Sequence, residues 1–279
     1  MASPYRGPSD APAPTPLLEL HGISKRFGAV QALEDVQFSV FPGEVVALVG
    51  DNGAGKSTLI KIISGIYRAD HGTIRWQGKQ VVIAAPNDST GLGIATVYQD
   101  LALCDNLDVV ANLFLGRELA TPGGPLGMMD EVTMERRAVE VLRRLSVKIP
   151  NVRIPIAALS GGQRQSVAVA RSVMGDNKVV ILDEPTAALG MAQTHEVLEL
   201  IKRLRAQGLG VVLISHNLAN VYEVADRITV LRLGRYVGTY DARATSREQL
   251  IAFMTGAAPG GGEAPAVSEG AIGHRETPA

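Results

Sequence analysis

The sequence predicts an α/β domain built on a mainly parallel sheet, with antiparallel strands near its start. Three unbroken apolar runs rich in β-branched residues, VVALVG, VVILDE and VVLISH, occupy residues 45–50, 179–184 and 211–216. Such runs are typical of central strands that are covered on both faces. Residues 17–23 and 36–41 instead alternate apolar and polar side chains, as half-buried antiparallel strands do. Helical patterns between the runs predict crossover connections and therefore a parallel sheet.

Two segments place apolar side chains at helical spacing. The first set is Val197, Leu198, Ile201 and Leu204, followed by Gly208 as a stop signal, and the second set is Ala138, Val141, Leu142 and Leu145. The second set follows a Gly/Pro-rich stretch at 121–127, which predicts a loop. We therefore expect a helical insert at about residues 100–159.

Composition limits the domain organisation. A chain of 279 residues corresponds to one large domain or two small ones at roughly 100 to 200 residues each. Residues 1–16 are rich in Pro, Ala and Ser, and residues 257–279 in Gly, Pro, Ala and Glu, so they are expected to form a flexible extension and a flexible tail. The folded unit is expected to span residues 17–256.

Charge and cysteine content exclude several classes of function. Lys and Arg number 27 against 28 Asp and Glu, and this net charge of −1 supplies no global basic field for nucleic acid or anionic lipid. No apolar run approaches the roughly 18 to 20 residues of a membrane-spanning helix. The single cysteine, Cys104, cannot form an intramolecular disulfide, which fits a reducing compartment.

A phosphate-binding loop follows the first apolar run. Residues 50–58 read GDNGAGKST, which satisfies G-x-x-x-x-G-K-[ST] between a strand and an apolar helix. Its backbone amides can surround a phosphate, Lys56 can reach the β- and γ-phosphates, Ser57 can ligate Mg²⁺, and Thr58 can donate to the α-phosphate. The candidate nucleotide-binding residues are Gly50, Asp51, Asn52, Gly53, Ala54, Gly55, Lys56, Ser57 and Thr58. This motif predicts a P-loop NTPase core that uses a nucleotide such as ATP with Mg²⁺.

An acidic pair ends the second apolar run. Asp183 and Glu184 are costly at the exit of a buried strand unless a cation or hydrogen-bond donors receive them. Mg²⁺ supplies such a cation, so we expect Asp183 to hold the metal and Glu184 to orient and deprotonate a water. Taken alone, the pair would more often be a surface turn.

A third motif, LSGGQRQ at 159–165, opens a helix with Ser160 at the N-cap, and the amides of Gly161 and Gly162 would be exposed to an anion. An ordinary capped helix is the alternative. With this motif the sequence resembles the nucleotide-binding subunit of an ABC transporter over residues 17–256. The resemblance implies that Ser160, Gly161, Gly162 and Gln163 complete the site of a second copy, in a homodimer, against the γ-phosphate held by that copy's Lys56.

Further positions match the same family. The resemblance implies that Phe27 stacks on adenine, that Gln99 contacts Mg²⁺ and water, and that His216 hydrogen-bonds the γ-phosphate. Without it, Phe27 is equally well a core aromatic and His216 a structural histidine. Gly190 departs from the pattern, because the family usually has an aspartate there.

Two function classes follow from the resemblance: a transport ATPase, or a non-transport ATPase acting on nucleic acid or the ribosome. One cysteine and a net charge of −1 favour transport. Residues 97–118 and 215–235 resemble ATPases of monosaccharide importers of the ribose, xylose and fructose type. This implies membrane permease subunits and an extracytoplasmic sugar-binding protein as partners, no nucleic acid, and a place at the cytoplasmic face of the inner membrane.

The helical insert is the expected docking region for the permease. Its apolar side chains Val109, Val110, Leu113 and Phe114 follow closely after Gln99, so we expect exposed members of this set to line a groove. The alternative is that they fill the core of the insert itself.

Overall fold

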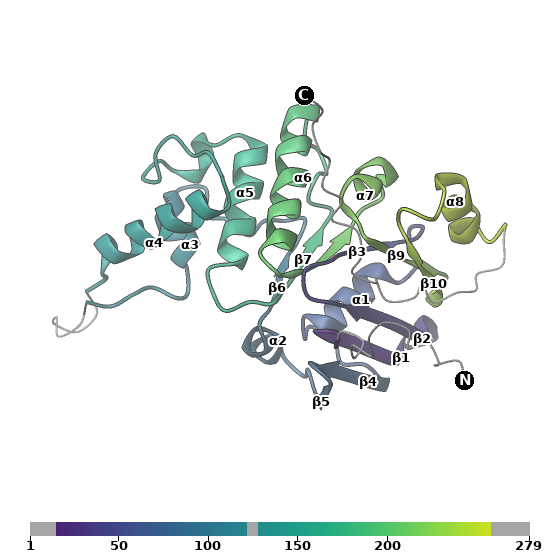
Figure 1. Ribbon diagram of the computed structural model, residues 1–279. Coiled ribbons are helices and arrows are strands. Elements are labelled where there is room, and N and C mark those ends of the chain that lie inside the picture. Colours follow the sequence, from purple (N-terminus) through teal and green to yellow (C-terminus); the bar gives the residue numbers. More distant parts are fainter. Residues whose placement is uncertain (1–14, 122–127, 258–279) are drawn as a thin grey trace, which may run out of the picture.

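A computed structural model describes residues 15–121 and 128–257 (Figure 1). Most of the predicted extension, tail and Gly/Pro-rich loop lie outside these ranges. The strands form one ten-stranded mixed sheet in the order β5-β4-β1-β2-β10-β9-β3-β8-β7-β6. The predicted fold class is confirmed: a mainly parallel core, an antiparallel segment and a group of inserted helices.

Five parallel strands form the part of the sheet that carries the candidate site. They are β3 (Val45–Val49), β6 (Ile94–Val97), β7 (Val179–Asp183), β8 (Gly210–Ile214) and β9 (Arg227–Arg232). Side chains of a strand point alternately to its two faces. In β3, Val45, Ala47 and Val49 accordingly join one apolar core, and Val46 and Leu48 join the other. Both faces are covered, which explains the unbroken apolar runs.

Antiparallel strands form the opposite part of the sheet. These are β1 (Leu18–Phe27), β2 (Val30–Val40), β4 (His71–Trp76) and β5 (Lys79–Val81). The alternating patterns at 17–23 and 36–41 predicted this pairing correctly. β10 (Arg235–Asp241) joins the two parts, because it pairs with β9 antiparallel and with β2 through Arg235 and Glu34.

Helices cover both faces of the sheet. α1 (Lys56–Ile63) packs its buried side chains into the core shared with the antiparallel strands, whereas α5 (Gly161–Ser172), α6 (Met191–Ala206) and α7 (Leu218–Val224) contribute to the core on the other face. Two short elements complete this part, α2 (Pro86–Leu92) and α8 (Arg247–Thr255). Gly208 follows α6 in a left-handed conformation, as expected of a helix stop.

Further helices lie between β6 and α5, at the left of Figure 1: α3 (Val109–Phe114), α4 (Glu131–Arg144) and the 3-10 turn η1 (Ile156–Ala158). Arg153 ties them together, because its guanidinium lies 2.7 Å from Glu135 and 3.4 Å from Asp108. None of the helices in the described ranges is long and apolar enough to cross a membrane.

The expectation that side chains of α3 line an exposed groove is wrong for the four residues named. Val109, Val110, Leu113 and Phe114 are each at most 2% exposed and belong to the apolar core under the parallel sheet. The helix packs against α4 and α5, so its apolar face is buried. These residues therefore stabilise the insert.

Candidate nucleotide-binding site

The phosphate loop connects β3 to α1 and depends on glycine at two close approaches. Gly50 has φ 151°, and a Cβ there would collide with the carbonyl oxygen of Leu231. Gly55, the N-cap of α1, has φ 99°, and a Cβ there would lie 2.6 Å from Leu33 Cδ2. Only glycine fits both conformation and space. The loop is therefore held at the carboxyl end of the sheet with α1 directed away from it.

Lys56 is the central cation of the loop. Its Nζ donates hydrogen bonds to the carbonyl oxygens of Gly50 at 2.6 Å and Asp51 at 3.0 Å. Burial lowers the pKa of the Lys56 ammonium below its usual range, while the nearby carboxylates of Glu184, Asp51 and Asp183 oppose that shift. The lysine is thus partly withdrawn from water, where its attraction for a phosphate is less screened.

The remaining loop residues form a surface that a ligand can reach. Asp51, Asn52, Gly53 and Ser57 are exposed, Thr58 is half-buried, and Ala54 is buried under the loop. Ser57 and Thr58 lie in the first turn of α1, where unpaired amides and the helix dipole favour an anion.

The acidic pair lies beside the phosphate loop because β7 and β3 both pair with β8. Burial, and next the neighbouring Glu184, raise the pKa of the Asp183 carboxyl, whereas Lys56 opposes the rise. Glu184 has a left-handed backbone, φ 51°, and its amide donates to Ile214 O at 2.9 Å. This hydrogen bond fixes the position of the Glu184 backbone at the end of β8.

His216 and Glu184 meet at the same edge. His216 Nδ1 lies 2.8 Å from Glu184 Oε2, and the imidazole is 76% exposed while the carboxylate is only 17% exposed. His216 is therefore not part of the buried core, and its imidazole is accessible to a ligand. A partly buried carboxylate with an exposed imidazole beside it can accept a proton from a water and contact a ligand above the loop.

Gln99 follows β6 at this edge and is exposed. Val97 pairs with Leu182, so the ends of β6 and β7 lie side by side. The segment after Gln99 is held by Arg171 of α5, whose guanidinium donates to Ala102 O at 2.8 Å and Leu101 O at 3.1 Å. Gln99 is thus anchored to the core on one side and to α5 on the other.

Phe27 lies at the end of β1 and is 41% exposed, so the core-aromatic alternative is wrong. Its ring contacts Tyr67 edge to face, with centroids 5.0 Å apart, and Lys25 Nζ lies 5.4 Å from its centroid. Tyr67 thereby orients a ring that still has free surface for stacking.

The LSGGQ segment begins α5 as predicted, with Ser160 as the N-cap. Ser160 Oγ accepts from Gln163 N at 3.2 Å, and Gln163 Oε1 accepts from Ser160 N at 3.0 Å. Gly161 is exposed, whereas Gly162 is buried against Gln193. None of the hydrogen bonds and ion pairs found within residues 15–121 and 128–257 joins this turn to the phosphate loop.

Two asparagines near the site escaped the sequence analysis. Asn217 caps α7 directly after His216, accepting from Ala219 N at 3.0 Å, and the buried Asn220 donates to Thr186 Oγ1 at 3.0 Å. Asn217 was detectable, because asparagine before an apolar helical pattern is an N-cap signal. The Asn220 contact joins segments 34 residues apart and depends on the tertiary fold.

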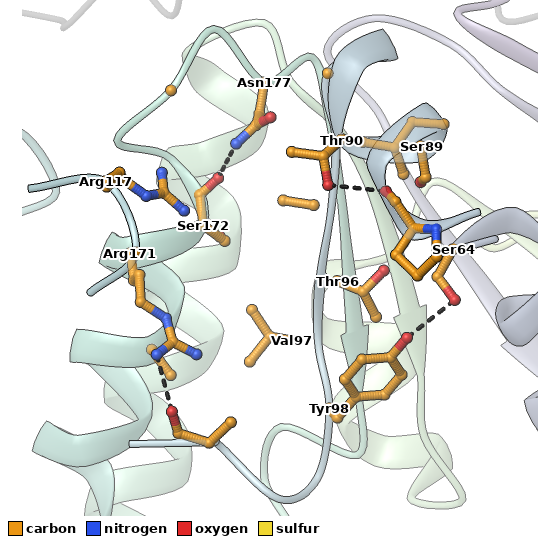
Figure 2. A pocket seen from close by; sticks show the side chains of 18 of the residues that line it. Ser64, Ser89, Thr90, Thr96, Val97, Tyr98, Arg117, Arg171, Ser172 and Asn177 are labelled. Atoms are coloured by element: carbon orange, nitrogen blue, oxygen red, sulfur yellow. Dashed lines mark hydrogen bonds between the residues drawn. The ribbon is translucent and has the colours of Figure 1, made fainter. Parts of the chain in front are cut away.

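A groove of about 880 Å³ lies between α5, with the segment that follows α3, on one side and β6 with α2 on the other (Figure 2). Arg117 and Arg171 lie on one wall, and Thr90, Thr96 and Tyr98 lie on the opposite wall. Tyr98 donates to Ser64 Oγ at 2.9 Å, which joins the end of β6 to the end of α1. The groove is continuous with the segment around Gln99.

The phosphate loop on a central parallel strand, with an acidic pair at the end of a nearby strand, defines a P-loop ATPase. The family model described as ABC transporter matches residues 33–187, and the chain belongs to this family as an ATP-binding cassette ATPase. It is 47% identical over 250 residues to the fructose import ATP-binding protein FrcA of Rhizobium meliloti, an alignment that covers 88% of this chain and 96% of FrcA.

Other comparisons agree. The xylose/arabinose import ATP-binding protein XylG of Sulfolobus acidocaldarius is 46% identical, with coverage of 88% of this chain and 96% of that one. The solved structure of an ABC transporter cassette in its ADP conformation matches at TM-score 0.73 and 26% identity, over 86% of this chain and 95% of that one. A dimeric post-hydrolysis cassette bound to ADP and phosphate matches at TM-score 0.67 and 25% identity, over 82% and 100%.

Proposed function

We propose that this chain is the ATP-hydrolysing subunit that drives import of a monosaccharide through a membrane permease. The observation that carries the chemistry is the meeting of Lys56, Asp183, Glu184 and His216 at one edge of the sheet. Import of sugars is supported by the names of the FrcA and XylG relatives. No observation favours the alternative of an ATPase that acts on nucleic acid.

The donor set fits a magnesium nucleotide. Mg²⁺ prefers oxygen ligands, and the Ser57 hydroxyl, the Asp183 carboxylate and the Gln99 amide oxygen are available at this edge. When bound, Mg²⁺ neutralises charge on the β- and γ-phosphates. Lys56 and the loop amides would hold the phosphates, Thr58 would donate to the α-phosphate, and the exposed face of Phe27 would stack on adenine.

The chain's own residues would perform hydrolysis as follows. The Glu184 carboxylate accepts a proton from the attacking water while the oxygen of that water bonds to the γ-phosphorus. The bond from phosphorus to the β–γ bridging oxygen breaks, and ADP leaves. His216 would orient the γ-phosphate from its exposed position beside Glu184, and Lys56 would stabilise the charge that develops on the bridging oxygen.

A homodimer would complete the site. The Ser160–Gln163 turn of one copy would meet the γ-phosphate held by Lys56 of the other. Consistent with this, no hydrogen bond or ion pair within the described ranges joins the turn to the phosphate loop of the same chain. The dimeric cassette among the compared structures supports this arrangement.

The groove between α5 and β6 is the proposed docking place for a cytoplasmic segment of the permease. The apolar face of α3 cannot serve as this surface because it is buried. Arg117 and Arg171 on one wall favour a segment that carries an acidic side chain. The chain would then lie at the cytoplasmic face of the inner membrane, and an extracytoplasmic binding protein would deliver the sugar to the permease.

Two variants test the chemistry. Lys56→Ala should weaken ATP binding, whereas Glu184→Gln should keep binding and lower turnover about 10²- to 10⁴-fold. Fluorescent-nucleotide titration and phosphate release measure the two effects. An active Glu184→Gln enzyme would refute the assignment of the base.

A separate experiment tests transport. Cells that express the permease operon with the wild-type chain should take up one of radiolabelled ribose, xylose and fructose, and uptake of that sugar should cease with either variant.

A further inference from the structure

Gln193 lies between two functional segments of one chain. It is half-buried in the first turn of α6, and its Oε1 accepts a hydrogen bond from Gly190 N at 3.3 Å. On its other side it covers Gly162, where an added Cβ would lie 3.0 Å from Gln193 Cβ and 3.2 Å from Cγ. The backbone of Gly162 therefore packs directly on the aliphatic part of the Gln193 side chain.

The first of these segments runs from the candidate base to α6. Ala187 N donates to Glu184 O at 3.0 Å, and Leu189 N donates to Thr186 O at 3.4 Å. The short turn from Glu184 to Gly190 is thus held together by its own hydrogen bonds, and Gln193 binds its last residue.

The second segment is the turn that begins α5. A Cβ added at Gly161 would lie 3.1 Å from Leu189 Cδ2, so Leu189 lies close to Gly161 as Gln193 does to Gly162, although Gly161 stays exposed. Neither glycine leaves space for a side chain on the side of α6, as in a closely packed contact. The turn at Ser160 and the turn after Glu184 therefore form one packed unit.

We infer that Gln193 is a positioning residue that makes these two turns move together. Under the proposed function, on which this inference rests, the turn at Ser160 serves the nucleotide of the partner copy while Glu184 serves the nucleotide of its own chain. Gln193 then links the two nucleotide sites of the dimer from within each chain.

Gly190 has space for a side chain, since nothing lies within 4 Å of an added Cβ, so glycine at this position is not required by packing.

A purely structural role for Gln193, as a capping residue of α6, predicts a different outcome. A capping contact stabilises the start of the helix and would not alter nucleotide-driven association. The test must therefore measure association separately from stability.

The measurement is ATP-dependent dimerisation of the full chain without Mg²⁺, by light scattering, in a Glu184→Gln background. Adding Gln193→Ala should raise the ATP concentration at half-dimerisation about tenfold, with nucleotide binding to the monomer nearly unchanged and with a modest fall in melting temperature from the lost hydrogen bond to Gly190 N. Gln193→Glu keeps the aliphatic packing and an acceptor for Gly190 N, so it should restore the original value. Glu196→Ala, on an exposed position of the same helix, is the matched control.

A pair of substitutions that enlarges Gly162 and shortens Gln193 provides the second measurement. Gly162→Ala adds a methyl group 3.0 Å from Gln193 Cβ and should weaken dimerisation. Gln193→Gly removes that neighbour, so the two substitutions should be non-additive: the ATP concentration at half-dimerisation of the double variant should rise by less than the product of the two single-variant fold-changes.

The outcomes separate the inference from the proposed function. If the Glu184→Gln chain stays monomeric in ATP, the shared site itself is wrong and the inference falls with it. If it dimerises and Gln193→Ala dimerises at the same ATP concentration, or the fold-changes of Gly162→Ala and Gln193→Gly simply multiply in the double variant, the inference alone is wrong.

Discussion

His216 Nδ1 and Glu184 Oε2 lie 2.8 Å apart, and they are brought together by the ends of two neighbouring strands, β8 and β7. The two residues are 32 positions apart in the sequence, but Asp183 pairs with Ile214 in the sheet. Glu184 directly follows β7, and His216 lies two residues after β8. The pairing of these two strands therefore holds both side chains at the edge of the sheet that carries the phosphate loop.

We expect His216→Ala to lower ATP turnover by about 10- to 10³-fold with little loss of nucleotide affinity, because a group that orients a proton acceptor and the phosphate acts mainly on the chemical step. Single-turnover phosphate release measures the effect. His195→Ala is a matched control, since His195 is also exposed and lies on α6 beside Glu223. Equal rates for the two variants would contradict the role of His216.

Asp183→Asn should stabilise the protein at neutral pH in the absence of nucleotide and Mg²⁺. Burial raises the pKa of Asp183, so the ionised carboxylate is less stable in the folded protein than in the unfolded chain. The cost is present above the raised pKa and disappears as pH falls through it. The melting temperature of Asp183→Asn should exceed that of the wild type by a few degrees at pH 7.5, and the gap should narrow toward pH 4. A gap that does not vary with pH would contradict this account.

Phe27→Ala should weaken ATP binding by about tenfold, because stacking of a base on an aromatic ring is worth roughly 1–3 kcal/mol. Stability should change little, since the ring is 41% exposed. Phe27→Tyr should retain affinity, and Val30→Ala, at a nearby residue that is 65% exposed, is the control. Equilibrium titration with a fluorescent ATP analogue measures all three. Unchanged affinity in Phe27→Ala would place the adenine elsewhere.

Adjacent residues separate the core of the insert from its docking surface. Phe114 is 2% exposed, whereas Leu115 is 42% exposed and lines the groove. Phe114→Asp should lower the melting temperature strongly, because it buries a charge in the core. Leu115→Asp should leave the melting temperature and basal hydrolysis near wild type and abolish stimulation of hydrolysis by the permease in a reconstituted complex. If Leu115→Asp is stimulated normally, the docking surface lies outside this groove.

Local sequence information was sufficient for much of the fold and for most residues placed at the candidate site. The turn at 50–58 requires glycine at strained positions, and the unbroken apolar runs require burial on both faces, so these features follow from a few neighbouring residues. The same holds for the cap at Ser160. The residues that form each of these patterns are close together in the chain, although the collision that requires glycine at position 50 is with the distant Leu231.

The tertiary structure decided which faces are buried and which distant groups meet. Helical spacing places Val109, Val110, Leu113 and Phe114 on one side of α3, but only packing against α4 and α5 determines that this side is buried. The contacts of His216 with Glu184, and of Gln193 with Gly162, depend on strand order and helix packing. Spacing along a chain determines the relative directions of nearby side chains, whereas burial and long-range contacts depend on what other segments lie opposite them.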